Sequence, residues 1–182
     1  MKTETNAGYI ARLAVTLLLI TAVVAAALAC VNAVTAPKIA ELNAQKTQNA
    51  IEAVLPGGGE PVDFTDDTGL VSTVYKGQAG YAVEVAPSGF NGTVTMMVGV
   101  DTSGKVLGIS IVNHTETAGL GAVAAADTAA GEAFRSQFVG MSGSVSVTKD
   151  GGQVDALTGA TITSRAVCTG VNAALSVVAK LG

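Results

Sequence analysis

The chain has 182 residues, of which 49% are hydrophobic and 13% charged, and its formal net charge is −4. This length predicts one domain with an appendage rather than two full domains. The basic residues form no cluster, so we expect no nucleic-acid partner, and the two cysteines, Cys30 and Cys168, are too few to hold a metal cluster within this chain.

The first predicted element is a membrane-spanning helix at residues 13–34. No charged residue occurs in residues 13–37, and the apolar run at residues 13–31 measures roughly 28 Å at the rise of an α-helix. That length matches the hydrocarbon core of a bilayer. We therefore predict a single-pass protein of the cell (inner) membrane, in contact with lipid.

The charges that flank this helix predict its orientation. Lys2 and Arg12 precede it, within a tail at residues 1–12, while Lys38 follows it. Positive residues favour the cytoplasmic side, so we expect a cytoplasmic N-terminus and an extracytoplasmic domain. Two alternatives stay open. One is a signal peptide cleaved after the small residues at 27–29, and the other is a lipoprotein with Cys30 as the lipidated residue.

Residues 35–59 are predicted to form a helical stalk or linker. Pro37 fits a restart of the helix, because proline is favoured at the first helical position. The helix then continues to about Leu55, and the segment Pro-Gly-Gly-Gly at residues 56–59 ends it. It is either a stalk that packs on neighbouring subunits or the first helix of the domain at residues 60–182.

The domain begins with short β-rich segments punctuated by Gly, Pro and Asp. Strands are predicted at residues 70–76, 81–86, 94–100 and 105–112, the last two joined by a turn at residues 101–104. Helical segments follow at residues 121–126 and 129–138, then a short strand at 145–148 and a final amphipathic helix. Grouped strands with segregated helices predict an α+β fold with a mainly antiparallel sheet and flanking helices.

The final helix is preceded by a small-residue turn. Residues 155–161 read Asp-Ala-Leu-Thr-Gly-Ala-Thr, or D-x-x-T-G-A-T. Thr161 lies close to the helix N-terminus, where free N–H groups and the helix dipole favour a phosphate, and Gly159 leaves room for a bulky group. The same residues also fit an ordinary Thr- or Ser-capped helix after a glycine turn.

This motif resembles the flavinylation signature of the FMN-binding domain in the G subunit of Rnf complexes and the C subunit of Na+-translocating NADH:quinone reductase. The resemblance implies a covalent FMN, attached by a separate flavin transferase through a phosphoester to Thr161. It also implies that the transferase recognises the preceding motif residues, which are Asp155, Thr158, Gly159 and Ala160.

A second segment strengthens the resemblance. Residues 114–121 read His-Thr-Glu-Thr-Ala-Gly-Leu-Gly and are similar to the E-T-P-G-L-G segment of the same family, with Ala118 in place of the proline. By this resemblance the flavin contacts are Glu116, Thr117, Gly119, Leu120 and Gly121. The alternative is a strand-to-helix connection in which Glu116 and Thr117 only cap the following helix.

Three further side chains have two interpretations each. His114, the only histidine, either tunes the flavin or is a structural or surface residue. Lys149 either pairs with the phosphate or is a solvated strand end. Cys168, on the final helix, is expected to be a small core residue rather than a redox group. With no tryptophan in the chain, Leu120 and Val or Met side chains are expected to contact the flavin.

The resemblance implies that the chain relays electrons through FMN and has no catalytic side chains of its own. The complex would move electrons between ferredoxin and NAD and couple this to Na+ or H+ translocation, with other membrane and Fe–S subunits as partners. The alternatives are a stand-alone flavinylated extracytoplasmic electron carrier, a C-type quinone reductase subunit, and a non-redox adhesion or scaffold domain.

Overall fold

The computed structural model describes residues 5–181, which divide between Gln45 and Lys46 into two compact units. Residues 1–4, which include Lys2 and the start of the predicted tail, lie outside the described residues, as does Gly182.

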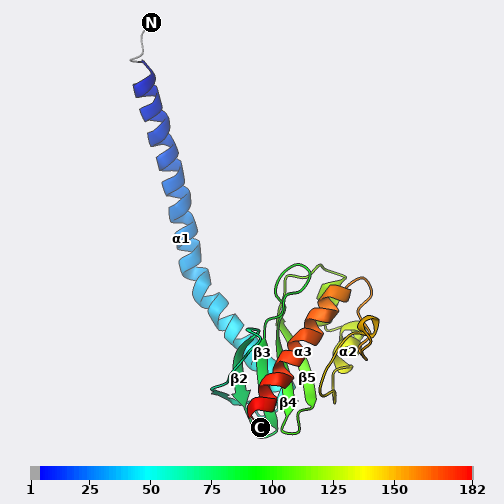
Figure 1. Ribbon diagram of the computed structural model, residues 1–182. Coiled ribbons are helices and arrows are strands. Elements are labelled where there is room, and N and C mark those ends of the chain that lie inside the picture. The colour runs from blue at the N-terminus through cyan, green and yellow to red at the C-terminus, as the bar shows by residue number, and fades with distance from the viewer. Residues whose placement is uncertain (1–4, 182) are drawn as a thin grey trace. The chain divides into compact units, whose positions relative to one another are not determined.

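Helix α1 runs from Thr5 to Val54 (Figure 1) and includes the predicted membrane span. It is long and apolar enough to cross a bilayer, and the large apolar side chains from Tyr9 to Leu42 are exposed, as expected of a surface that faces lipid. The predicted restart at Pro37 is wrong, because the helix continues through this residue. Proline has a φ that is compatible with a helix, but it removes one backbone hydrogen bond. This costs the helix about 3 kcal/mol, and the neighbouring alanines favour the helix.

Five strands form one antiparallel sheet in the order β1-β2-β3-β4-β5. The strands are β1 (Glu60–Val62), β2 (Val71–Lys76), β3 (Gly80–Val85), β4 (Thr95–Asp101) and β5 (Val106–Asn113). The sequence pattern does not predict β1, because three residues are too few to show an alternation. Pro61 is tolerated there because β1 is an edge strand. The predicted α+β class and antiparallel sheet are confirmed.

The turn between β4 and β5 forms as predicted. The Asp101 carboxylate accepts hydrogen bonds from the backbone N–H groups of Ser103 and Lys105, at 2.8 and 2.9 Å. Gly104 adopts φ +78°, a conformation that favours glycine. Local turn chemistry therefore fixes the register of this hairpin.

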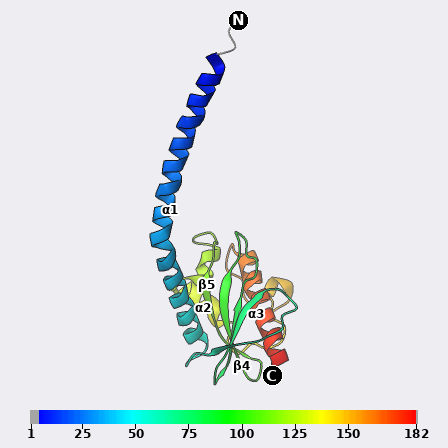
Figure 2. The same ribbon diagram turned by 90° about the vertical axis from the view of Figure 1, so that its left-hand side faces the viewer.

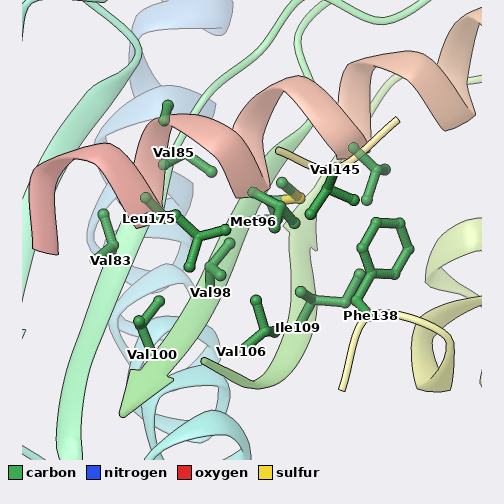
Figure 3. Close-up of a cluster of buried hydrophobic side chains, with 14 of the residues drawn as sticks. Val83, Val85, Met96, Val98, Val100, Val106, Ile109, Phe138, Val145 and Leu175 are labelled. Atoms are coloured by element: carbon green, nitrogen blue, oxygen red, sulfur yellow. The ribbon is translucent and has the colours of Figure 1, made fainter. Parts of the chain in front are cut away.

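Successive side chains of each strand point to opposite faces of the sheet, and both faces are buried. The larger core lies between the sheet and helix α3 (Thr161–Leu181), as Figure 3 shows. Valines of β3 and β4 dominate it, with Met96, Phe138 and Leu175 beside them. On the other face, Ala82 and Met97 pack against buried residues at the end of α1 and against Leu55, which directly follows the helix. Figure 2 shows the last turns of α1 beside the sheet, on the side opposite α3. The end of the predicted stalk segment therefore contributes to the core of the globular unit.

Helix α3 is also long and apolar enough to cross a membrane, but most of it is buried in this core. Val167, Val171, Ala174 and Val178 lie on its buried face at helical spacing. Cys168 is 4% exposed among them, which confirms its predicted core position.

The segments between β5 and α3 are short. They comprise the 3₁₀ helix η1 (Gly121–Ala125), helix α2 (Ala129–Ser136) and the 3₁₀ helix η2 (Thr148–Asp150). The predicted strand at residues 145–148 is wrong, since only one bridge, from Val147 to Val154, forms there. The Asn172 side chain takes the place of a neighbouring strand by bonding the backbone N–H and C=O of Val145, each at 2.8 Å.

Candidate functional site

The loop after β5 places a carboxylate inside the domain. β5 ends at Asn113, and the His114 Nδ1 atom accepts a hydrogen bond from the Glu116 backbone N–H at 3.3 Å. This turn directs Glu116 inward, where the residue is only 8% exposed. Gly119 then adopts φ +75°, and η1 begins at Gly121. His114 therefore has a structural role in this loop.

Two hydrogen bonds hold the Glu116 carboxylate. The Thr163 hydroxyl on α3 donates to Oε2 at 2.5 Å, and the backbone N–H of Asn91 donates to Oε1 at 3.0 Å. Burial opposes ionisation of Glu116, but these hydrogen bonds outweigh it and lower the pKa of the carboxyl group. Glu116 therefore connects three segments that are far apart in the sequence.

The loop between β3 and β4 adds an aromatic side chain. Asn91 is fixed to Thr115 by two further hydrogen bonds, from Asn91 Nδ2 to the Thr115 carbonyl at 2.8 Å and from Thr115 Oγ1 to the Asn91 carbonyl at 2.6 Å. Phe90, which directly precedes Asn91, is 67% exposed. Phe90 is not among the residues predicted from the sequence, although an aromatic residue between turn residues was a signal that could have identified it.

The D-x-x-T-G-A-T segment forms a turn that leads directly into α3. The Ala160 N–H donates to the Leu157 carbonyl at 3.0 Å, and Gly159 adopts φ +75°. Ser164 braces this turn, because its hydroxyl accepts from the Leu157 N–H and donates to the Ala160 carbonyl, both at 3.0 Å. Helix α3 begins at Thr161, close to the predicted position.

A positively charged side chain lies beside Thr161. Lys149 Nζ donates to Thr161 Oγ1 at 3.2 Å. Lys149 belongs to η2 rather than to the end of a strand, and the next residue, Asp150, makes a two-point ion pair with Arg165 on α3. The hydroxyl of Thr161 is thereby adjacent to a positive charge.

The two sequence segments meet at one cavity of about 380 Å³. Seven of the ten predicted cofactor-binding residues line it: Glu116, Thr117, Leu120, Gly121, Gly159, Ala160 and Thr161. Phe90, Lys149, Ile162 and Thr163 complete the lining. Of these four, only Lys149 was predicted from the sequence as a candidate contact, with the phosphate.

Three predicted residues are not part of the cavity lining. Asp155 and Thr158 are exposed on the turn, and the backbone of Asp155 is held by the Gln137 side chain. Gly119 has open space around it, so its φ of +75° is the feature that favours glycine there.

Glycines keep the cavity open. A Cβ at Gly121 would overlap the Glu116 carboxylate and the Thr163 hydroxyl, and one at Gly159 would meet Leu120 Cδ2 at 3.0 Å. The rim of the cavity is apolar, because Phe90, Leu120 and Ile162 are 67%, 45% and 48% exposed. The cavity thus has an apolar rim and a polar wall that carries Thr161 and Lys149.

Comparison with known proteins agrees with this geometry. Residues 89–176 match the model of the FMN-binding domain family, a range that contains the whole cavity lining. The chain is 36% identical to the G subunit of the Na(+)-translocating ferredoxin:NAD(+) oxidoreductase complex of Acetobacterium woodii, over 91% of this chain and 90% of the relative. It is 34% identical to the G subunit of the ion-translocating oxidoreductase complex of Methanosarcina acetivorans, over 93% and 94%.

A third relative matches over about half of each chain. The G subunit of the proton-translocating ferredoxin:NAD(+) oxidoreductase complex of Clostridium ljungdahlii is 41% identical over 52% of this chain and 51% of its own length. With two relatives covered almost end to end, and with an FMN-binding domain behind a long apolar helix, this chain belongs to the family of G subunits of Rnf-type ion-translocating oxidoreductase complexes.

Proposed function

We propose that this chain relays electrons, within an Rnf-type complex, through an FMN attached covalently to Thr161. The observation that carries the proposal is the cavity whose lining combines residues of two distant segments, 116–121 and 159–163, and includes Thr161. Asp155 and Thr158 lie outside the cavity on an exposed turn, a position suited to recognition by a flavin transferase.

The residues present fit FMN. A cavity of about 380 Å³ lies within the usual range for small-molecule sites. The apolar rim of Phe90, Leu120 and Ile162 suits a flat ring system, and the start of α3 with Lys149 suits a phosphate. FMN carries its ring system at one end and its phosphate at the other, so it needs both the apolar rim and the phosphate-binding region.

Attachment requires a phosphoryl donor with a good leaving group, and flavin adenine dinucleotide meets this requirement. The Thr161 Oγ1–P bond forms on the flavin-side phosphorus while the pyrophosphate P–O bond breaks. AMP leaves with the electron pair, and the hydroxyl proton passes to a base on the transferase or to water. The chain contributes the nucleophile and its placement, and the separate transferase contributes the catalysis.

The bound flavin would supply reversible electron acceptance and donation. The chain's own residues then hold the ring and exclude water from part of it. Phe90 and Leu120 are exposed enough to contact both the ring and solvent, so one edge of the ring would stay accessible to a redox partner. Glu116 fixes the wall of the cavity by joining Thr163 to the loop at Asn91.

The partners follow from the names of the relatives, which are subunits of ferredoxin:NAD(+) oxidoreductase complexes named for Na(+) or proton translocation. We extend this assembly to the present chain, with membrane and Fe–S subunits as its electron donor and acceptor. Coverage of 90% or more of two complex subunits favours this role over a stand-alone carrier.

Substitution of Thr161 tests the proposal. Full-length chain co-expressed with a flavin transferase should give a fluorescent band on a denaturing gel, and the Thr161→Val variant should lose it because it lacks the hydroxyl. The Thr161→Ser variant keeps the nucleophile and should retain labelling. Thr169→Val, on an exposed threonine of the same helix, is the matched control. Thr158→Val should weaken labelling less, since the transferase recognises Thr158 but does not modify it. Fluorescence that persists in Thr161→Val would overturn the assignment.

The proposed orientation puts the FMN domain outside the cytoplasm. A cysteine at Thr102, an exposed residue of the β4–β5 turn, should react with a membrane-impermeant thiol reagent in intact cells. Labelling of Thr102→Cys only after lysis would reverse the topology.

A further inference from the structure

Lys149 reaches Thr161 across twelve residues of sequence. Its Nζ donates to Thr161 Oγ1 at 3.2 Å, and its side chain lines the cavity. In the described part of the chain, residues 5–181, no carboxylate lies within ion-pair distance of Lys149. The charge of Lys149 is therefore available to whatever is attached at Thr161.

The neighbouring residue holds this lysine in place. The two carboxylate oxygens of Asp150 accept from Nε and Nη2 of Arg165, at 2.7 and 2.6 Å. The hydrogen bonds with Arg165 lower the pKa of Asp150, so both partners are charged at neutral pH. Because Arg165 lies on α3 one turn after Thr161, the pair fixes η2 against the start of this helix.

The backbone of η2 is fixed as well. The Thr148 N–H donates to the Val154 carbonyl at 2.8 Å, and Gly151 reverses the chain with φ +83°. The exposed side chain of Lys149 therefore extends from an anchored backbone.

We propose that Lys149 stabilises the phosphoryl group transferred to Thr161, and that the Asp150–Arg165 pair positions Lys149 for this task. The proposal rests on attachment of FMN at Thr161. The product, a phosphodiester between the flavin ribityl chain and Oγ1, carries one negative charge on its non-bridging oxygens. An ammonium group already within hydrogen-bond distance of Oγ1 reaches these oxygens with a small side-chain adjustment.

Labelling kinetics test the proposal. Flavin-free full-length chain in detergent is mixed with purified flavin transferase and flavin adenine dinucleotide, and band fluorescence is followed with time. Lys149→Met should slow labelling about tenfold, the lower end expected for loss of one charge-assisted contact at an exposed site. Lys149→Arg should restore most of the rate, and Lys149→Glu should be slower than Lys149→Met. Lys105→Met, on an exposed lysine outside the cavity lining, is the matched control.

Kinetic parameters distinguish this role from docking of the transferase. If Lys149 acts on the phosphoryl group, Lys149→Met lowers kcat with little change in the KM for the chain. A raised KM with unchanged kcat would mean that the transferase merely recognises Lys149, and would overturn the proposal. Asp150→Asn and Arg165→Met should each lower kcat less than Lys149→Met, and their double variant should be no slower than the stronger single variant.

A spectroscopic measurement separates contact from general stability. The ³¹P resonance of the phosphodiester should differ between folded and unfolded wild-type chain, and Lys149→Met should shift the folded resonance toward the unfolded position without changing Tm. If wild type is not labelled at all, attachment at Thr161 fails. If wild type and Lys149→Met are labelled at the same rate with the same ³¹P shift, only the role of Lys149 is refuted.

Discussion

The carboxylate of Glu116 connects three parts of the domain, and its replacement by the isosteric amide should loosen all three. In Glu116→Gln the amide oxygen can accept only one of the two hydrogen bonds now donated by Thr163 and Asn91, while the amide NH₂ faces the other donor. A hydrogen bond to a charged group contributes roughly 1.5–3 kcal/mol. Because the site borders a cavity that water can enter, we expect a loss near the lower end, about 2 kcal/mol.

Thermal unfolding of the full chain in detergent measures this loss. For a globular unit of this size, about 2 kcal/mol corresponds to a fall in Tm of about 5–8 °C at pH 7. Glu60→Gln, on the exposed edge strand β1, should leave Tm unchanged. The pKa of Glu116 is lowered in the folded state, so its contribution is present above the ordinary glutamate pKa and is lost as the pH falls through the lowered value. The difference between wild type and variant should therefore narrow in acid.

A double-mutant cycle that combines Glu116→Gln with Thr163→Val tests this reasoning. If the Thr163 hydroxyl bonds Glu116 as the structure shows, the two substitutions should be less than additive, with a coupling energy of about 1 kcal/mol. Additive effects, or an unchanged Tm in Glu116→Gln, would refute the reasoning.

The remaining predictions concern other residues of the globular unit. Gly121→Ala should lower Tm by several degrees and reduce flavin loading, because the new Cβ overlaps Glu116 and Thr163, whereas Gly119→Ala should cost only about 1 kcal/mol for its left-handed conformation. Cys168 should resist thiol reagents until the domain unfolds, since burial raises the pKa of its thiol to about 11; rapid labelling of folded protein would contradict this. Desolvation opposes ionisation of Asp66, but hydrogen bonds from Thr68 and Val71 lower its pKa to about 2. Asp66→Asn should therefore reduce stability at pH 7, and the difference should disappear as the pH falls from the ordinary aspartate pKa, about 4, through this lowered value; a constant difference would argue against this role.

Local patterns in the sequence determined much of the architecture. The uncharged apolar run predicts the membrane helix, because a continuous hydrophobic stretch needs no tertiary partner to be recognised. The turn at residues 101–104 and the start of α3 near Thr161 are equally local, since Asp101 and Ser164 make their hydrogen bonds within a few residues. The motif at residues 155–161, together with the segment at residues 114–121, likewise indicates the family, because both are continuous stretches of sequence.

Side-chain contacts across the fold decided the rest. The valines at 145 and 147 alternate like a strand, but Asn172, 27 residues beyond Val145, bonds the backbone that a strand would have paired. The restart predicted at Pro37 is wrong for a different, local reason, because α1 continues through this residue despite the hydrogen bond that proline removes.

The site shows the same division. Its two motifs are visible in the sequence, but the cavity between them depends on the bond from Thr163 to Glu116, 47 residues apart, and on the anchoring of Asn91 that brings Phe90 to the rim. No periodicity encodes such contacts, because each depends on where the folded sheet and α3 carry loops that are distant in the chain. The sequence determined which residues are suited to FMN, and the tertiary structure decided which of them face the same cavity.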